Sequence, residues 1–463
     1  MLANFADNFC CITKMHIRFD GNFASRFSAI IMNVTDMTPM FFEFIENHAN
    51  EDSSKLLLKY NGKIRDFDLK FALTQIECRK KGAVKLKNFI SNPGMLFPDS
   101  LAYEQSSHEA VAMFHSSLAG SSHSVLDMTA GLGIDAMAFA NKCASVTACE
   151  INATKADVLA HNSQASGLDN FTVLNADSVE WLKSNDTRFN TIFIDPARRD
   201  CHNGRVYNFR DCLPDVVALQ DFLTCRCDTL LIKASPLLDI SATLKDIHCV
   251  KSIRAVSVNG ECKEILIEAS SGKLKTNADN DSGESLSGTI ADCKILKEAI
   301  DLNNDGDIVS RFSFQSNLNS SNVNYASFAG FGSDDTGDGK MDNRQYSYRY
   351  LYEPNAPMMK LSPWGELCDR MRGLHKLDPS SHLFVSDSYI AEFPGRILKI
   401  DRAIGKKHAK EIQGSHLNVV SRNYPLSPDE IRKKYSLKEG SDKFLYATRI
   451  ASKPIMILAE KIQ

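Results

Sequence analysis

The chain has 463 residues, of which 43% are hydrophobic and 24% charged, the balance of an ordinary globular protein. This length exceeds what one hydrophobic core usually serves, so we expect two or three domains. A formal charge of -3 excludes a uniformly basic nucleic-acid binder. No stretch of the sequence approaches the roughly 20 apolar residues of a membrane-spanning helix, which excludes an integral membrane protein of that type.

The 13 cysteines are scattered along the chain, and no two of them form a Cys-x-x-Cys pair. Reduced thiols fit this spacing better than a disulfide framework or a zinc site. The first residues lack the basic start and apolar core of a secretory signal. We therefore expect a cytoplasmic protein.

In chain order, residues 1–39 have no regular period and are expected to form an N-terminal extension. Between 40 and 100, apolar residues recur at spacings of three and four, which predicts amphipathic helices in a small N-terminal domain. The segment EQSSHEAVAMFHSSLA, at 104–119, is expected to form one more helix that leads into the next domain.

Residues 101–270 alternate short β-branched runs with helical stretches, which predicts a doubly wound α/β sheet with parallel strands. The last two runs, SIRAVSV and EILIEAS, are joined by residues 259–263 alone, too few for a parallel crossover. We therefore expect these two strands to form an antiparallel hairpin, with one antiparallel strand at the edge of the sheet.

Residues 271–345 are rich in Ser, Asn, Asp and Gly, and we expect a polar, loop-rich segment there. Within it, DLNNDGDI at 301–308 copies the first part of a calcium-binding loop. The twelfth position holds Phe312 instead of the required bidentate Glu, so no metal site is predicted.

From 346 to 463 an α+β pattern returns, and this last domain is basic. Between Arg396 and Lys453 there are 14 lysines and arginines against 6 aspartates and glutamates.

A glycine-rich turn, DMTAGLGID at 127–135, follows the first predicted strand. Gly131 and Gly133 would let the backbone bend sharply and approach a ligand closely. Carboxylates follow each of the first four strands: Asp127, Glu150, Asp177 and Asp195. The carboxyl ends of parallel strands share one crevice, and an anionic crevice repels a diphosphate while it attracts the cationic S-adenosylmethionine.

Each carboxylate has an expected partner on this cofactor. Glu150 stands 19 residues after Gly131, the spacing of an acid that accepts from ribose hydroxyls. Asp177 is the candidate for the adenine amine and Asp127 for the methionine end, although both could instead cap helices. The predicted cofactor-binding residues are Asp127, Thr129, Ala130, Gly131, Gly133, Asp135, Glu150, Ile151, Asp177, Ser178 and Asp195.

The sequence DPARR, at 195–199, stands at the mouth of the fourth strand. An acid followed by proline at this place could accept hydrogen bonds from an exocyclic amine and so orient its nitrogen toward a methyl donor. We therefore predict Asp195, Pro196 and Arg198 as catalytic residues. Arg198 and Arg199 could grip a substrate phosphate or could pair with the acidic rim.

The strand after DPARR ends in Lys233-Ala234-Ser235-Pro236 and offers no cysteine nucleophile. This speaks against covalent chemistry at a pyrimidine C5 atom.

The chain resembles a family of RNA methyltransferases that combine a class I catalytic domain, a DPARR motif and a C-terminal THUMP-like domain. The segments that carry the resemblance are LAYEQSSHEA, DMTAGLGID, FIDPARR, YLYEPNAPMMK, SHLFVSD, FPGR and SRNYP. It extends over about residues 40–463.

The resemblance implies the class I (Rossmann-like) methyltransferase fold, a doubly wound sheet with an antiparallel last strand. Its domains would be a helical or ferredoxin-like domain at 40–100, the methyltransferase domain at 101–270, the loop-rich segment at 271–345 and a THUMP-like α+β domain at 346–463. S-adenosylmethionine would be the cofactor, and rRNA or tRNA the substrate.

Basic and aromatic side chains of the C-terminal domain could contact phosphates and stack on unpaired bases. The candidate RNA-binding residues are Arg199, Lys406, Lys407, Arg422, Tyr424, Lys433 and Lys434. Alternatively, IRKKYSLKEG at 431–440 is only a solvated helix and turn. The leading hypothesis is an RNA base N-methyltransferase; the alternatives are a methyltransferase for a protein or small molecule, and an RNA-binding protein with an inactive catalytic domain.

Overall fold

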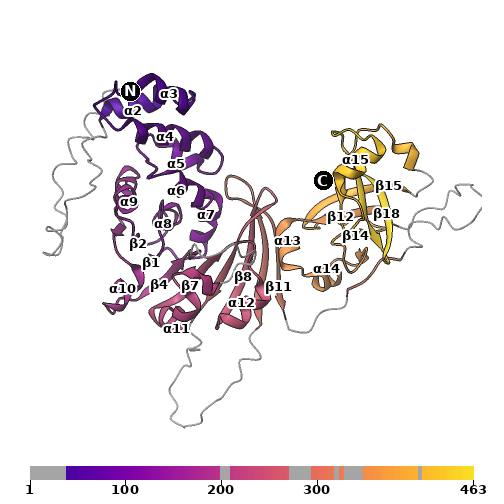
Figure 1. Cartoon of the computed structure of the whole chain (residues 1–463). Coiled ribbons are helices and arrows are strands. Elements are labelled where there is room, and N and C mark those ends of the chain that lie inside the picture. Colours follow the sequence, from indigo (N-terminus) through magenta and orange to yellow (C-terminus); the bar gives the residue numbers. More distant parts are fainter. Residues whose placement is uncertain are drawn as a thin grey trace, which may run out of the picture.

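The computed structural model describes residues 38–198, 209–270, 294–316, 323–327, 348–404 and 409–462. Three parts follow one another along the chain: a helical part, a large sheet covered by helices, and a second, smaller sheet (Figure 1). The expected N-terminal extension lies outside the described residues up to position 37.

The described N-terminal part consists of helices and their connections. They are α2 (Pro39–Asn47), α3 (Ser53–Tyr60), α4 (Leu69–Gly82), α5 (Lys87–Ser91), α6 (Ser100–Gln105) and α7 (Glu109–Ser117). Phe41, Leu56 and Ile76 are buried between α2, α3 and α4. Asp52 and Asp68 accept hydrogen bonds from the first-turn N–H groups of α3 and α4, which fixes where these helices begin. Of the two alternatives for this part, the structure therefore shows the helical one.

The expected single helix at 104–119 is wrong, because residues 106–108 separate α6 from α7. His108 Nδ1 accepts from the N–H of Ala110 at 3.2 Å, and Ser107 Oγ donates to Asp135 Oδ2 at 2.5 Å. Side-chain bonds of this kind compete with the continuation of a helix. The break brings Ser107 to the carboxyl end of β7 (Cys227–Ala234), where Lys233 bonds to it.

The large sheet has nine strands in the order β11-β10-β8-β9-β7-β4-β1-β2-β3. They are β1 (Ser124–Asp127), β2 (Ser145–Cys149), β3 (Phe171–Leu174), β4 (Phe189–Ile194), β7 (Cys227–Ala234), β8 (Val250–Val258), β9 (Glu261–Ala269), β10 (Ile295–Leu302) and β11 (Ile308–Ser316). Neighbours from β3 to β7 are parallel, and β9 is antiparallel to both β7 and β8.

Helices cover both faces of this sheet. One face carries α7 together with α8 (Ile134–Ala140) and α9 (Ala153–Ala165), and the other carries α10 (Ser178–Lys183), α11 (Val216–Arg226) and α12 (Ile240–Asp246). A second apolar cluster, with Phe89, Phe97 and Met137, joins the N-terminal helices to α8. The doubly wound α/β prediction is confirmed, and Figure 1 shows the N-terminal helices above α8 and α9.

Two expectations about the sheet are corrected. The hairpin of β8 and β9 forms as predicted, but β9 lies between β7 and β8 and not at the edge. Residues 295–316, expected as loops, form β10 and β11, and the calcium-like segment is part of this hairpin and its turn. The overall composition of residues 271–345 is rich in Ser and Asp, and it conceals the apolar side chains that these strands bury. Ala299, Phe312 and Phe314 are among them.

The C-terminal part has a seven-stranded sheet in the order β13-β14-β12-β15-β18-β17-β16. Its strands are β12 (Tyr350–Pro354), β13 (His375–Lys376), β14 (Phe384–Ser386), β15 (Gly395–Ile404), β16 (Asn418–Ser421), β17 (Lys443–Ile450) and β18 (Lys453–Lys461). Its helices are α13 (Ala356–Leu361), α14 (Trp364–Arg370), α15 (Pro428–Tyr435) and the 3-10 turn η6 (Ala409–Ile412). Met358 and Leu367 pack against Phe312 and Phe314, which joins this part to β11.

Two short pieces lie on the carboxyl side of β4. Strand β5 (Ala197–Arg198) pairs with β6 (Cys212–Leu213), and the 3-10 turn η3 (Phe209–Asp211) precedes β6. Among the residues that the structure describes, every helix is too short or too polar to cross a bilayer.

Candidate active site

The glycine-rich turn connects β1 to α8 and has two residues with positive φ. Gly131 has φ +55° and Gly133 has φ +87°, a region that L side chains rarely adopt. A Cβ on Gly133 would overlap Leu159 Cδ1, the end of a side chain that can shift, so the positive φ is the stronger reason for glycine here. The turn is tied to the next strand, because Ala130 N donates to the carbonyl oxygen of Cys149 at 2.9 Å.

The four predicted carboxylates lie at the carboxyl ends of four adjacent parallel strands. Asp127 ends β1, and Glu150, Asp177 and Asp195 follow β2, β3 and β4. Thr129 links two of these ends, since its N–H donates to Asp127 Oδ1 at 2.9 Å and its Oγ1 accepts from Asp195 N at 2.8 Å. The strand order thus gathers all four along one edge of the sheet.

Asp127 is buried, with a relative exposure of 1%. Burial, reinforced by the charges of Asp135 and Asp195, raises the pKa of Asp127 to about 8. At neutral pH this carboxyl is therefore largely protonated until a cation comes close. A cationic ligand at this place would favour the ionised form, which suits the ammonium and sulfonium of S-adenosylmethionine better than a phosphate.

Glu150 supports the glycine turn from the neighbouring strand. Its Oε2 accepts from Gly131 N at 3.0 Å and its Oε1 from Asn152 N at 2.7 Å. Each carboxylate oxygen can accept a further hydrogen bond, so ribose hydroxyls can still be bound. Ile151, next to it, is 70% exposed and offers apolar surface beside the turn.

Two of the other predicted cofactor residues already bond within the protein. Asp177 accepts from the N–H groups of Val179 and Glu180 and so caps α10, as its alternative role anticipated, while Ser178 is buried. Asp135 bonds to Ser107 and His115 on the α7 side of the sheet. Cofactor binding by these residues stays a prediction.

Asp195 forms an ion pair that the sequence did not indicate. Lys233 Nζ, at the end of β7, lies 2.5 Å from Asp195 Oδ2 and 3.0 Å from Ser107 Oγ. Burial alone would lower the pKa of Lys233, but the carboxylates of Asp195, Asp135 and Glu264 outweigh it and raise the pKa above its usual value. Lys233 is therefore a permanent cation that fixes the Asp195 carboxylate.

The buried imidazole of His115 extends this network from Asp135 to Glu264 on β9. His115 Nδ1 lies 2.7 Å from Asp135 Oδ1, and its Nε2 lies 2.5 Å from Glu264 Oε1. Burial opposes the charge, but the two carboxylates raise the pKa of His115 to about 10, so both ring nitrogens carry protons at neutral pH. Lys233 and His115 were missed because their partners are distant in the sequence, and the only signal was a lysine at a strand end.

The remaining predicted residues fall into two groups. Arg199, Lys406 and Lys407 lie outside the described residues, and Arg198 is in strand β5, next to the buried Pro196. In the C-terminal part, Lys433 and Lys434 are exposed on α15.

Two of the C-terminal candidates have structural contacts. Arg422 pairs with Glu353 at 2.9 Å, and Tyr424 packs against the core of the C-terminal part. In Figure 1, α15 lies far from β1 and β4. The structure therefore does not bring these basic residues together with Asp195.

Comparisons with known proteins agree with this architecture. A crystal structure of an inferred methyltransferase from Porphyromonas gingivalis W83 has a TM-score of 0.74 and 27% identity, and the match covers 92% of this chain and 98% of that one. A THUMP domain-like family matches residues 395–461, and a ferredoxin-like domain family matches residues 350–394. The chain is a class I methyltransferase by fold, with a THUMP-like C-terminal domain.

A Mycoplasma mobile protein named as an uncharacterised RNA methyltransferase is 24% identical over 159 residues. The match covers 33% of this chain and 44% of that protein, so it spans less than half of the relative's length.

The family matches refine the C-terminal part of the chain, which follows the methyltransferase sheet. The THUMP-like match begins at 395, with β15, whereas we expected the THUMP-like domain to begin at 346. The ferredoxin-like match covers β12 to β14 and not the N-terminal helices. Both matched regions share one sheet, because β12 pairs with β15.

Replacing Glu150 with alanine should weaken S-adenosylmethionine binding by roughly ten- to a hundredfold, because charge-assisted hydrogen bonds are worth about 1.5 to 3 kcal/mol. Isothermal titration calorimetry measures this affinity. Glu180→Ala, which removes an exposed carboxylate from α10, is the matched control and should bind normally. Equal affinities of Glu150→Ala and the wild type would contradict the assignment.

Replacing His115 with glutamine should lower the unfolding free energy at pH 7 by about 3 to 5 kcal/mol, because two buried carboxylates lose their cation. The stabilisation from charged His115 is complete below its unfolded pKa of about 6.5 and is lost as pH rises through about 10. Denaturant titrations from pH 6 to 10 should therefore show a declining stability in the wild type only.

The surface variant His48→Gln breaks a partly exposed pair with Glu51 and should cost under about 1 kcal/mol. If His115→Gln and the wild type lose stability in parallel over this pH range, His115 is not the charged centre of the network.

Proposed function

We propose that this protein is an S-adenosylmethionine-dependent methyltransferase that acts on a base nitrogen of rRNA or tRNA. The observation that carries the proposal is the Asp195 carboxylate, which Lys233 holds at the carboxyl end of β4, beside the strands that lead to Asp127 and Glu150. The proposed setting is the cytoplasm, where the nine described free cysteines would stay reduced.

The residues at the carboxyl ends of β1 to β4 fit this cofactor. Gly131 and Gly133 make the tight turn after β1, and Glu150 can accept from ribose hydroxyls beside the exposed Ile151. Asp127, ionised by the approach of a cation, would hold the methionine end. When bound, S-adenosylmethionine supplies the activated methyl group.

Asp195 has the position and the charge to orient an amine. Lys233 bonds to Oδ2, and no described residue bonds to Oδ1, which can therefore accept from an exocyclic N–H of the substrate. Pro196 is buried and fixes the backbone behind the carboxylate. Burial raises the pKa of Asp195, and the Lys233 ammonium opposes this by stabilising the ionised form, in which Asp195 accepts a hydrogen bond and orients the nitrogen.

The choice of RNA as substrate is supported by three observations. They are the THUMP domain-like match over 395–461, the Mycoplasma mobile relative named as an RNA methyltransferase, and the exposed Lys433 and Lys434 on α15. We propose a base nitrogen because an acid followed by proline suits an exocyclic amine.

Asp195→Asn should reduce methyl transfer to RNA by about 100- to 1000-fold, the usual loss for one preorganised polar group, and leave S-adenosylmethionine affinity within a few-fold. The assay uses tritiated cofactor with rRNA and tRNA from cells that lack the gene, followed by nucleoside mass spectrometry. The Arg188→Gln variant, which loses an exposed pair with Asp228 at the opposite, amino ends of β4 and β7, is the control.

If the wild type transfers the labelled methyl group to proteins or small molecules and leaves the RNA unlabelled, the proposed substrate is contradicted. Equal transfer by Asp195→Asn and the wild type would contradict the role of Asp195.

A further inference from the structure

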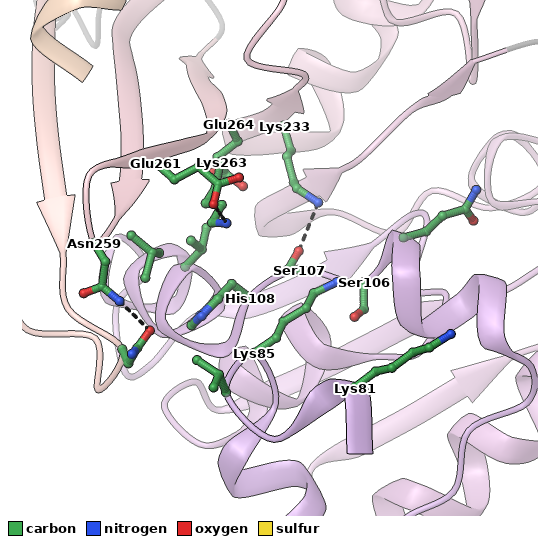
Figure 2. A pocket seen from close by; sticks show the side chains of 15 residues that line it. Lys81, Lys85, Ser106, Ser107, His108, Lys233, Asn259, Glu261, Lys263 and Glu264 are labelled. Carbon is green, nitrogen blue, oxygen red and sulfur yellow. Dashed lines mark hydrogen bonds and ion pairs between the residues drawn. The ribbon is translucent and has the colours of Figure 1, made fainter. Parts of the chain in front are cut away.

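A pocket of about 530 Å³ lies beside the pair of Asp195 and Lys233. Its walls come from the end of α4 and the loop after it, from the break between α6 and α7, and from the β8–β9 hairpin (Figure 2). Lys233 belongs to both places, since it lines the pocket and bonds to Asp195. The pocket therefore adjoins the proposed reaction site on the side away from the glycine turn.

Four lysines line this pocket: Lys81, Lys85, Lys233 and Lys263. The two carboxylates of the lining are already engaged, because Glu261 pairs with Lys263 and Glu264 bonds to the charged His115. Lys81 pairs with Glu77, which is outside the lining. The pocket thus has more positive than negative charge.

Lys85 stands out among these lysines. Its Nζ donates to the carbonyl oxygens of Tyr103 at 2.9 Å and Glu104 at 3.1 Å, and no described carboxylate pairs with it. The Tyr103 ring also lies 5.1 Å from this Nζ, but an ammonium has three N–H donors and the two carbonyls take two, which leaves one for a ligand. Burial and the nearby charges of Lys233 and Lys263 lower the pKa of Lys85 to about 8, as expected for a cation that lacks an anion.

His108 adds a neutral donor to the same wall. Because its Nδ1 accepts from Ala110 N, the ring carries its proton on Nε2. Burial and the charges of Lys263 and Lys85 lower the pKa of His108, which keeps the ring neutral. In Figure 2, His108 lies between Lys85 and the hairpin residues. A compact anion could therefore contact Lys85, Lys263 and this N–H together.

We propose that this pocket binds a backbone phosphate of the RNA strand that carries the target base, with Lys85 as its central cation. The inference rests on the proposed function, and it assigns the positioning of the substrate to the N-terminal helices as well as to the C-terminal part. Lysine is a point-charge partner that suits a phosphate. A phosphate held here lies beside Lys233, so the attached nucleotide can reach Asp195.

The test compares Lys85→Gln and Lys263→Gln with the control Lys63→Gln, which changes an exposed lysine of the same helical part outside the pocket. The probes are bulk tRNA and a fluorescein-labelled 12-nucleotide single-stranded RNA, and the readout is fluorescence anisotropy at several salt concentrations. Each pocket variant should bind roughly tenfold more weakly, with the salt slope reduced by about 0.7 to 0.9. All three variants should keep the wild-type affinity for S-adenosylmethionine. Lys63→Gln should also keep the wild-type melting temperature.

Lys263→Gln loses no backbone contact, so it keeps the test valid if Lys85→Gln is unstable. Wild-type RNA affinity and salt slope in both pocket variants would overturn the proposal, and so would a Lys85-dependent binding of poly-glutamate peptide or inorganic phosphate without any effect on RNA. Failure of the proposed function has a different signature, namely no methyl transfer to RNA by the wild type while RNA binding still depends on Lys85.

Discussion

The Lys233 ammonium group holds together segments that are far apart in the chain. It comes from the end of β7, bonds to Asp195 after β4, and bonds to Ser107 in the break between α6 and α7. Ser107 also donates to Asp135, which pairs with His115 and through it with Glu264 on β9. A chain of alternating charges therefore connects the N-terminal helices, α8, strand β9 and the proposed catalytic carboxylate.

This arrangement explains why charged groups can be buried at the centre of the molecule. An isolated buried carboxylate would be strongly destabilising, but here Asp135, Glu264 and Asp195 have cations within hydrogen-bond distance. Asp127 lacks such a partner, and its raised pKa reflects this. The protein thus keeps one carboxyl, Asp127, that lacks a cationic partner until a cationic ligand binds, next to Asp195, which already has one in Lys233.

The parts of the fold that follow local patterns could be predicted from the sequence. The strands β1 to β4 and β7 to β9, and the carboxylates after β1 to β4, follow from alternation and from the glycine turn. Lys233, His115 and Ser107 could not be found in this way, because pairing across 20 to 149 residues leaves no periodic signal. Similarly, the strands β10 and β11 were concealed by their polar flanks, and basic residues such as Arg422 turned out to pair with Glu353.

The central claim is that Lys233 holds Asp195 in its reactive orientation without contacting the cofactor. Single-turnover methyl transfer by Lys233→Gln, measured beside calorimetric S-adenosylmethionine affinity, tests it most directly. The account predicts a loss of transfer of about 100-fold, with cofactor affinity within a few-fold of the wild type. Transfer at the wild-type rate, or a loss explained entirely by weaker cofactor binding, would contradict it.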